Sequence, residues 1–151
     1  MQLTRNFSLI ELTRSEMAAR RGWSNVPDSV ALAHLTMLAW YVLEPLREKL
    51  GRPILINGGY RNKQVNTVVG GADNSLHMLG RAADIVVPGV SPFDVARAAL
   101  SLGLPTTEVI LEFGEWVHVA VAEPGKAPER RLFTAVRDAD GTVTYKKGLL
   151  T

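Results

Sequence analysis

The chain has 151 residues, a net charge of +2 and no cysteine, which is enough sequence for one domain with a buried core. Hydrophobic residues make up 46% and charged residues 21%, so disordered, collagen-like and coiled-coil chains are excluded. The absence of cysteine excludes a disulfide framework, a cysteine zinc finger and a thiol nucleophile, and Lys+Arg 17 against Asp+Glu 15 gives no reason to expect nucleic-acid binding.

The N-terminal residues contain no apolar stretch of the kind found in secretory signals. No apolar run approaches the roughly 18 residues that a membrane span needs. We therefore expect a protein that is made in the cytoplasm, works as a monomer and does not insert stably into membranes. If its target lies outside the cytoplasm, a separate route must carry it there.

Helix signals dominate the N-terminal part of the chain. The capping-box pattern SLIE at 8–11 opens a short helix that should end near Gly22. A long helix is expected from about Asp28, because apolar residues recur there at helical spacing. Pro45 should kink this helix and Gly51 should end it.

Strand signals dominate the later part. The pattern predicts the following further elements in chain order: a short buried strand at 53–56, a short helix after 61, a Gly-rich connection at 69–79, a strand at 82–87, a helix at 91–102, strands at 109–113 and 116–122, and a hairpin of 132–137 with 142–145. Because helices come first and strands later, we expect an α+β fold with a small antiparallel sheet and helices packed mainly on one side.

The C-terminal segment is more basic than the rest. Residues 124–151 hold six Lys or Arg and three Asp or Glu, whereas residues 1–123 hold 11 and 12. We expect 1–151 to form a single domain, with 124–151 as a basic hairpin extension of it. The extension is either an ordinary solvated surface or an electrostatic handle for an anionic polymer.

Two polar residues interrupt apolar strands. Asp84 lies in AADIVV, where a carboxylate is costly unless it is paired, for example with Arg81 or Arg97, or binds a metal. His118 lies in WVHVAV, on the face opposite the valines. His77 ends the flexible connection and can reach the same place. Two histidines and one carboxylate, with a fourth position left to water, are the ligand set of a catalytic zinc, although other divalent metals suit it too.

Hydrolysis at such a site also needs a carboxylate that moves protons. Glu115, in the expected turn three residues before His118, is the first candidate, and Glu112 is the competitor. Either could instead be a solvated loop acid. Arg61 follows a strand and two glycines, so it could stabilise an oxyanion on a substrate carbonyl, or it could be an ordinary surface arginine.

Three motifs match those of a known family. Residues 75–84, SLHMLGRAAD, match S-x-H-x-x-G-x-A-x-D in full, and EWVH at 115–118 matches E-x-x-H. GYR at 59–61 matches S-G-Y-R, except that Gly58 replaces the usual Ser. From Phe7 to about Ala122 the chain resembles the zinc D-Ala-D-Ala carboxypeptidase and L-alanyl-D-glutamate endopeptidase family of peptidoglycan peptidases, in particular its short single-domain members from phages and prophages.

The resemblance implies a hedgehog/D-Ala-D-Ala-peptidase-like fold and one bound Zn²⁺. It also implies these residue roles: His77, Asp84 and His118 as zinc ligands, Glu115 as general base and then acid, Arg61 as the group that polarises the substrate carbonyl, and Ser75 and Tyr60 as residues that contact the substrate or support the site.

The function implied by the resemblance is a zinc-dependent murein peptidase. The L-alanyl-D-glutamate bond is the first expected target, in a phage or prophage endolysin that reaches peptidoglycan through a holin or from a virion. A first alternative is a D-Ala-D-Ala carboxypeptidase or dipeptidase, which should hold a terminal carboxylate with a cation. A second is a non-catalytic, zinc-containing cell-wall-binding or virion module, against which a general base such as Glu115 argues.

Overall fold

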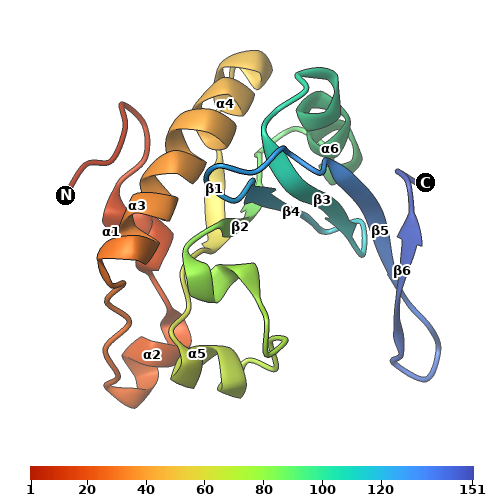
Figure 1. Cartoon of the computed structure of the whole chain (residues 1–151). Coiled ribbons are helices and arrows are strands. Elements are labelled where there is room, and N and C mark those ends of the chain that lie inside the picture. The colour runs from red at the N-terminus through yellow and green to blue at the C-terminus, as the bar shows by residue number, and fades with distance from the viewer.

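A six-stranded sheet, covered on one face by helices, forms the frame of the molecule (Figure 1). The computed structural model describes residues 1–151. In sheet order the strands are β1 (Leu55–Gly58), β2 (Ala82–Val86), β4 (Trp116–Val121), β3 (Thr106–Glu112), β5 (Arg131–Arg137) and β6 (Val143–Lys147). The expected α+β class is confirmed, and the sheet is antiparallel except where β5 runs parallel to β3.

Helical segments precede and connect these strands. They are α1 (Leu9–Thr13), α2 (Glu16–Arg21), α3 (Ser29–Leu38), the π-helical turn η1 (Ala39–Leu43), α4 (Glu44–Leu50), α5 (Lys63–Val68), the 3₁₀ turn η2 (Leu76–Leu79) and α6 (Pro92–Ser101). The run from α3 to α4 and helix α6 pack against the same side of the sheet (Figure 1).

The expected first helix is two helices. Ser8 caps α1 with the predicted capping box, and α2 ends at Gly22 as predicted. Between them Arg14 is extended, with ψ 129°, because Ser15 starts a new helix and accepts a hydrogen bond from the Ala18 N–H. The prediction of one short helix ending near Gly22 is therefore wrong at this junction.

The long helix runs without a break from residue 29 to residue 50. Pro45 lacks the N–H that its turn needs and its ring crowds the preceding turn, and the helix widens there into η1. Gly51 ends the run in a left-handed conformation, φ 62°. By length and composition alone, the run could cross a membrane. This is weak evidence for a membrane span, because a buried core helix passes the same test.

The core lies between this helix run, α6 and the sheet. Leu35, Leu38 and Val42 are fully buried there against Val117 and Val119 of β4. Strand side chains alternate between faces, so the residues between these valines point to the other side of the sheet. The apolar helical layer therefore fixes which face of the sheet carries His118.

Strands β1 and β3 depart from their predicted limits, and β3 spans Thr106–Glu112 instead of 109–113. The strand expected to be buried at 53–56 is β1, shifted to Leu55–Gly58, and it lies at the sheet edge with Leu55 exposed. The predicted C-terminal hairpin is present as β5 and β6. It continues the main sheet, because β5 pairs with β3 along five register positions from Glu108 to Glu112.

Candidate metal centre

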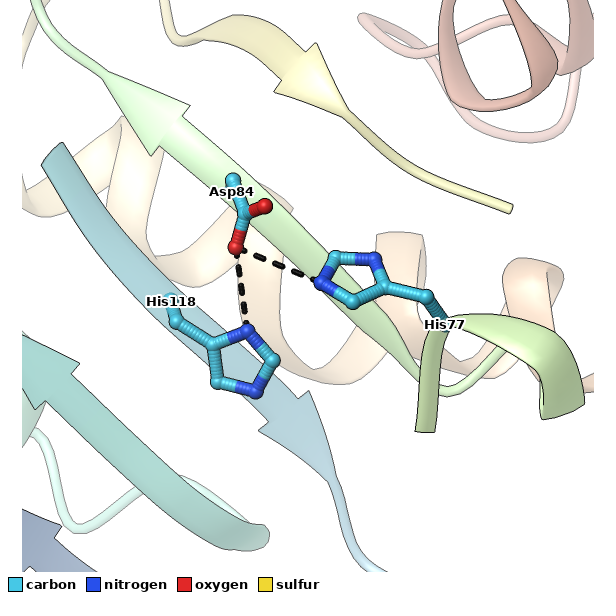
Figure 2. A group of neighbouring side chains, drawn as sticks. All are labelled: His77, Asp84 and His118. Carbon is cyan, nitrogen blue, oxygen red and sulfur yellow. Dashed lines mark hydrogen bonds and ion pairs between the residues drawn. The ribbon is translucent and has the colours of Figure 1, made fainter. Parts of the chain in front are cut away.

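Three metal-binding side chains from separate elements meet on the face of the sheet away from the helix run (Figure 2). Asp84 of β2 and His118 of β4 are register partners on neighbouring strands, and His77 reaches the same place from η2. Asp84 Oδ1 lies 3.0 Å from His118 Nδ1 and 3.3 Å from His77 Nε2. The structure thus brings together the three residues that the sequence singled out as ligands.

The donor set fits a zinc ion in kind and spacing. Ligand atoms in a tetrahedral zinc site stand about 3.3 to 3.6 Å apart, given zinc–ligand bonds of roughly 2.0–2.2 Å. The three donor atoms here all lie within 4.8 Å of one another, two of the separations being 3.0 and 3.3 Å. Only small side-chain adjustments would place all three around one ion, and three protein ligands leave a fourth position open.

His77 is held in an orientation that suits metal binding. It is 3% exposed, and its Nδ1–H donates to the Gly59 carbonyl at 2.8 Å. Its main-chain N–H donates to Ser75 Oγ at 3.3 Å. A ligating histidine commonly gives its other ring N–H to such an acceptor, so Gly59 leaves Nε2 free to face Asp84.

His118 lies between two carboxylates. Its Nδ1 faces Asp84 and its Nε2 faces Glu108 Oε1 at 3.2 Å. Burial alone would lower the pKa of His118, but the hydrogen bonds and charges of Asp84 and Glu108 raise this pKa to about 9. Burial would raise the pKa of Asp84, but bonds to His118 and His77 hold it well below its ordinary value. The site therefore stabilises positive charge, as a cation-binding site must.

Gly59 packs too closely on α1 for any larger residue, and this gives a prediction. A Cβ at this position would stand 2.2 Å from the Leu12 carbonyl oxygen. Gly59→Ala should therefore cost about 1–3 kcal/mol of unfolding free energy, as overpacking does, and should displace the carbonyl that holds His77. Thermal melts and zinc titration of Gly59→Ala and of the unaltered protein check it. Equal zinc affinity in the two proteins would contradict it.

The motif around Arg61 lies beside the triad. Arg61 is partly buried, and its Nε has no hydrogen-bond partner. Burial lowers the pKa of Arg61, and the charge of Asp84 opposes this shift. Gly58 stands where the resembling family has Ser, and a Cβ there would lie 3.3 Å from Asp84 Oδ2. Tyr60 is 8% exposed and belongs to the core, although it also borders a cavity.

The two candidate proton-transfer residues occupy different places. Glu115 is exposed in the turn between β3 and β4 and does not line either cavity at the triad. Glu112 ends β3, is partly buried and lines the larger cavity together with His118. Burial raises the pKa of Glu112, against the opposing charge of His118. The assignment of Glu115 by resemblance stays a prediction, and the geometry favours Glu112.

The simpler explanations of the polar residues are not what the structure shows. Neither Arg81 nor Arg97 forms the salt bridge with Asp84 that a purely structural aspartate would need. Arg81 is buried and donates instead to the Val121 carbonyl and Thr107 Oγ1, while Arg97 pairs with its neighbour in α6. His34 contacts the Leu79 carbonyl, outside the triad.

Two cavities meet at the triad. The larger has a volume of about 810 Å³ and extends from His77 and His118 across β3 to Phe133 and Tyr145 of the C-terminal strands. The smaller, about 350 Å³, lies beside β1 and α2. Arg61 and Asp84 line both cavities, so the cavities meet at these two residues, whereas His77 and His118 line the larger cavity alone.

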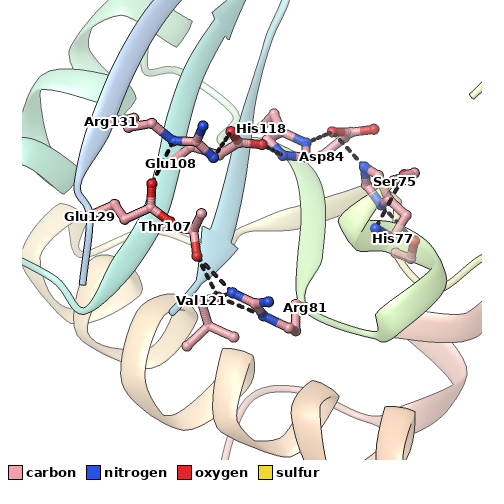
Figure 3. Close-up of polar contacts among 11 residues, drawn as sticks. Ser75, His77, Arg81, Asp84, Thr107, Glu108, His118, Val121, Glu129 and Arg131 are labelled. Atoms are coloured by element: carbon pink, nitrogen blue, oxygen red, sulfur yellow. Dashed lines mark hydrogen bonds and ion pairs between the residues drawn. The ribbon is translucent and has the colours of Figure 1, made fainter. Parts of the chain in front are cut away.

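Sequence reasoning missed two residues of this site. Glu108 contacts His118, and Arg131 of the C-terminal extension contacts Glu108 (Figure 3). A signal for Glu108 existed, because it alternates with Val109 and Leu111 and so shares a strand face with Ile110. No local signal marked Arg131, because only the parallel pairing of β5 with β3 brings it to Glu108.

Comparison with known proteins places the chain in a family of peptidases. A family model described as Peptidase M15 matches residues 5–120. The chain is also 36% identical over 107 residues to the zinc D-Ala-D-Ala carboxypeptidase of Streptomyces albus G. That alignment covers 70% of this chain and 40% of the Streptomyces protein, so the chain matches less than half of the length of this relative.

Proposed function

The chain belongs to the peptidase M15 family, and from this premise we propose that it is a zinc-dependent peptidase that hydrolyses an amide bond in the peptide stems of peptidoglycan. The observation that carries the proposal is the triad of His77, Asp84 and His118 in a cleft with a carboxylate and an arginine beside it. Bound to the triad, zinc would polarise the scissile carbonyl and lower the pKa of the attacking water. A purely structural zinc site normally has a fourth protein ligand, whereas the group here supplies three.

The remaining groups supply proton transfer and charge stabilisation. Glu112 takes a proton from the water while the water oxygen bonds to the carbonyl carbon. Glu112 then gives this proton to the amide nitrogen when the C–N bond breaks. The Arg61 guanidinium, whose Nε has no partner in the protein, donates to the carbonyl oxygen as negative charge develops on it. Ser75 supports the reaction indirectly, because its hydroxyl holds the main chain of His77.

We further propose that the enzyme cuts inside a peptide, at the L-alanyl-D-glutamate bond, as an endolysin does. The support is that cavities lie on two sides of Asp84 and Arg61, which line both, since an internal bond has chain on both sides. Most cations of the larger cavity are already paired: Arg131 with Glu108 at 3.2 Å and Lys126 with Glu123 at 2.8 Å. Arg81 lies 4.0 Å from Glu123, which leaves Arg61 as the arginine of this cavity without an ion pair, and that guanidinium is assigned to the scissile carbonyl oxygen.

A carboxypeptidase is the second candidate. The name of the Streptomyces relative supports it, and so does Arg14, an exposed cation that lines the smaller cavity and forms no ion pair within 4.0 Å. A terminal carboxylate bound by Arg14 would place the last amide bond of the peptide near the triad. The two candidates therefore differ in what occupies the smaller cavity.

Digestion of purified peptidoglycan followed by mass spectrometry separates these candidates. We expect fragments with new N-terminal D-glutamate, because the cleft accommodates chain on both sides of the bond. Protein stripped of metal with a chelator and the same protein reloaded with Zn²⁺ serve as controls. Release of D-alanine alone would establish the carboxypeptidase, and no release of either product by the reloaded protein would contradict the peptidase proposal.

A further inference from the structure

The C-terminal strands lie outside the part of the chain that the family model matches, yet they reach the metal centre. The model ends at residue 120, whereas β5 begins at Arg131 and pairs in parallel with β3. In this register Arg131 stands beside Glu108, and Phe133 stands beside Ile110. The extension thus adds side chains to the same face of the sheet that carries His118.

A continuous set of polar contacts links β5 to this ligand (Figure 3). His118 Nε2 lies 3.2 Å from Glu108 Oε1, and Glu108 Oε2 lies 3.2 Å from Arg131 Nη2. Arg131 Nε in turn lies 3.3 Å from Glu129 Oε2. The side chains of His118 and Glu108 are 10% and 17% exposed, so water has little access to the first contact.

The orientation of His118 depends on this contact. An imidazole can present either ring nitrogen to a metal, and the hydrogen bond made by the other nitrogen decides which one is free. Here Nδ1 faces Asp84, while Nε2 faces Glu108. With a metal bound at Nδ1, the one remaining ring proton would lie on Nε2, where Glu108 would accept it. Acceptors of this kind orient a ligand and increase its basicity.

Glu108 needs a partner of its own. A carboxylate with one oxygen on His118 keeps a second oxygen to satisfy, and a largely buried charge is costly unless it is paired. Arg131 donates to that second oxygen, and Glu129 restrains Arg131 from the same segment. The arginine thereby fixes the carboxylate, and the carboxylate fixes the imidazole.

We propose that Glu108 and Arg131 are positioning residues that hold His118 with Nδ1 toward the metal, which makes strand β5 of the C-terminal extension part of the metal centre. This inference rests on the metal-binding half of the proposed function. Neither residue is required to touch the substrate. The extension therefore contributes to the metal centre through a specific contact.

Zinc affinity, measured by competition with a chelator in the absence of peptidoglycan, tests the proposal. Glu108→Ala should weaken zinc binding by about 10- to 100-fold, the usual cost of removing the partner of a ligand. Glu108→Gln should recover part of the loss, because its amide oxygen still accepts the Nε2–H. The zinc affinity of Arg131→Ala should lie between the affinities of Glu108→Gln and of the unaltered protein. Arg137→Ala is the matched control, because it removes a cation from the same strand and contacts Phe113 instead.

Nitrogen NMR of the zinc-loaded, unaltered protein provides a test that needs no variant. The His118 ring is expected to carry its proton on Nε2, and Glu108→Ala is expected to change the ring signals. Thermal melts of each metal-free variant separate this effect from loss of folding. A proton on Nδ1, or unchanged zinc affinity in Glu108→Ala, would overturn the proposal. Tight zinc binding without hydrolysis of peptidoglycan would contradict only the proposed function.

Discussion

Glu112→Gln is expected to keep its zinc and to lose hydrolysis of peptidoglycan, with kcat lower by about 10²- to 10⁴-fold, the usual contribution of a general acid–base group. Glutamine has nearly the same shape but cannot accept and return a proton. Glu112 lines the cavity with His118 and is not one of the three zinc ligands. We therefore expect kcat to decrease while zinc content and folding stay unchanged.

Glu115→Gln is the matched comparison for this experiment. Glu115 lies three residues further along the chain, in the turn that follows β3, and is exposed, so its change to glutamine should leave kcat within a few-fold of the unaltered protein. Steady-state kinetics on soluble stem peptides, with zinc content measured on the same samples, gives the answer. The opposite result, with Glu115→Gln inactive and Glu112→Gln active, would assign the proton to the E-x-x-H motif as the resemblance does.

His118→Ala is expected to lose both zinc and hydrolysis. The substitution removes one of three donors and leaves Asp84 and Glu108 facing each other without the imidazole that lies between them. Zinc affinity should fall by more than the roughly 10- to 100-fold that loss of a ligand's partner costs. His34→Ala is the control, because His34 contacts the Leu79 carbonyl away from the triad. Equal zinc content in His118→Ala and His34→Ala would remove His118 from the metal centre.

Local patterns were enough to find the triad. A carboxylate in AADIVV and a histidine in WVHVAV each interrupt an apolar strand, and the cost of burying them unpaired implies a shared partner. Strand alternation then placed His118 on the face away from the valines, as the structure has it. The α+β class followed from the order of helix and strand signals for a similar reason, since both depend on short periodic patterns.

Features that depend on distant pairing could not be predicted. Arg131 meets Glu108 only because β5 pairs in parallel with β3, and no short pattern encodes which strands become neighbours. The choice between Glu112 and Glu115 turns on where regular strand geometry ends, and β3 runs through Glu112 before the turn begins. Helix limits failed at Arg14 because the cap of Ser15 outweighed the continuing helical pattern.

The position of zinc in a crystal of the metal-loaded protein, located by anomalous scattering at the zinc edge, tests the account most directly. We expect one ion per chain, bound by His77 Nε2, Asp84 Oδ1 and His118 Nδ1, with Glu108 still on His118 Nε2. An ion bound elsewhere, or no ion near these side chains at saturating zinc, would contradict the account.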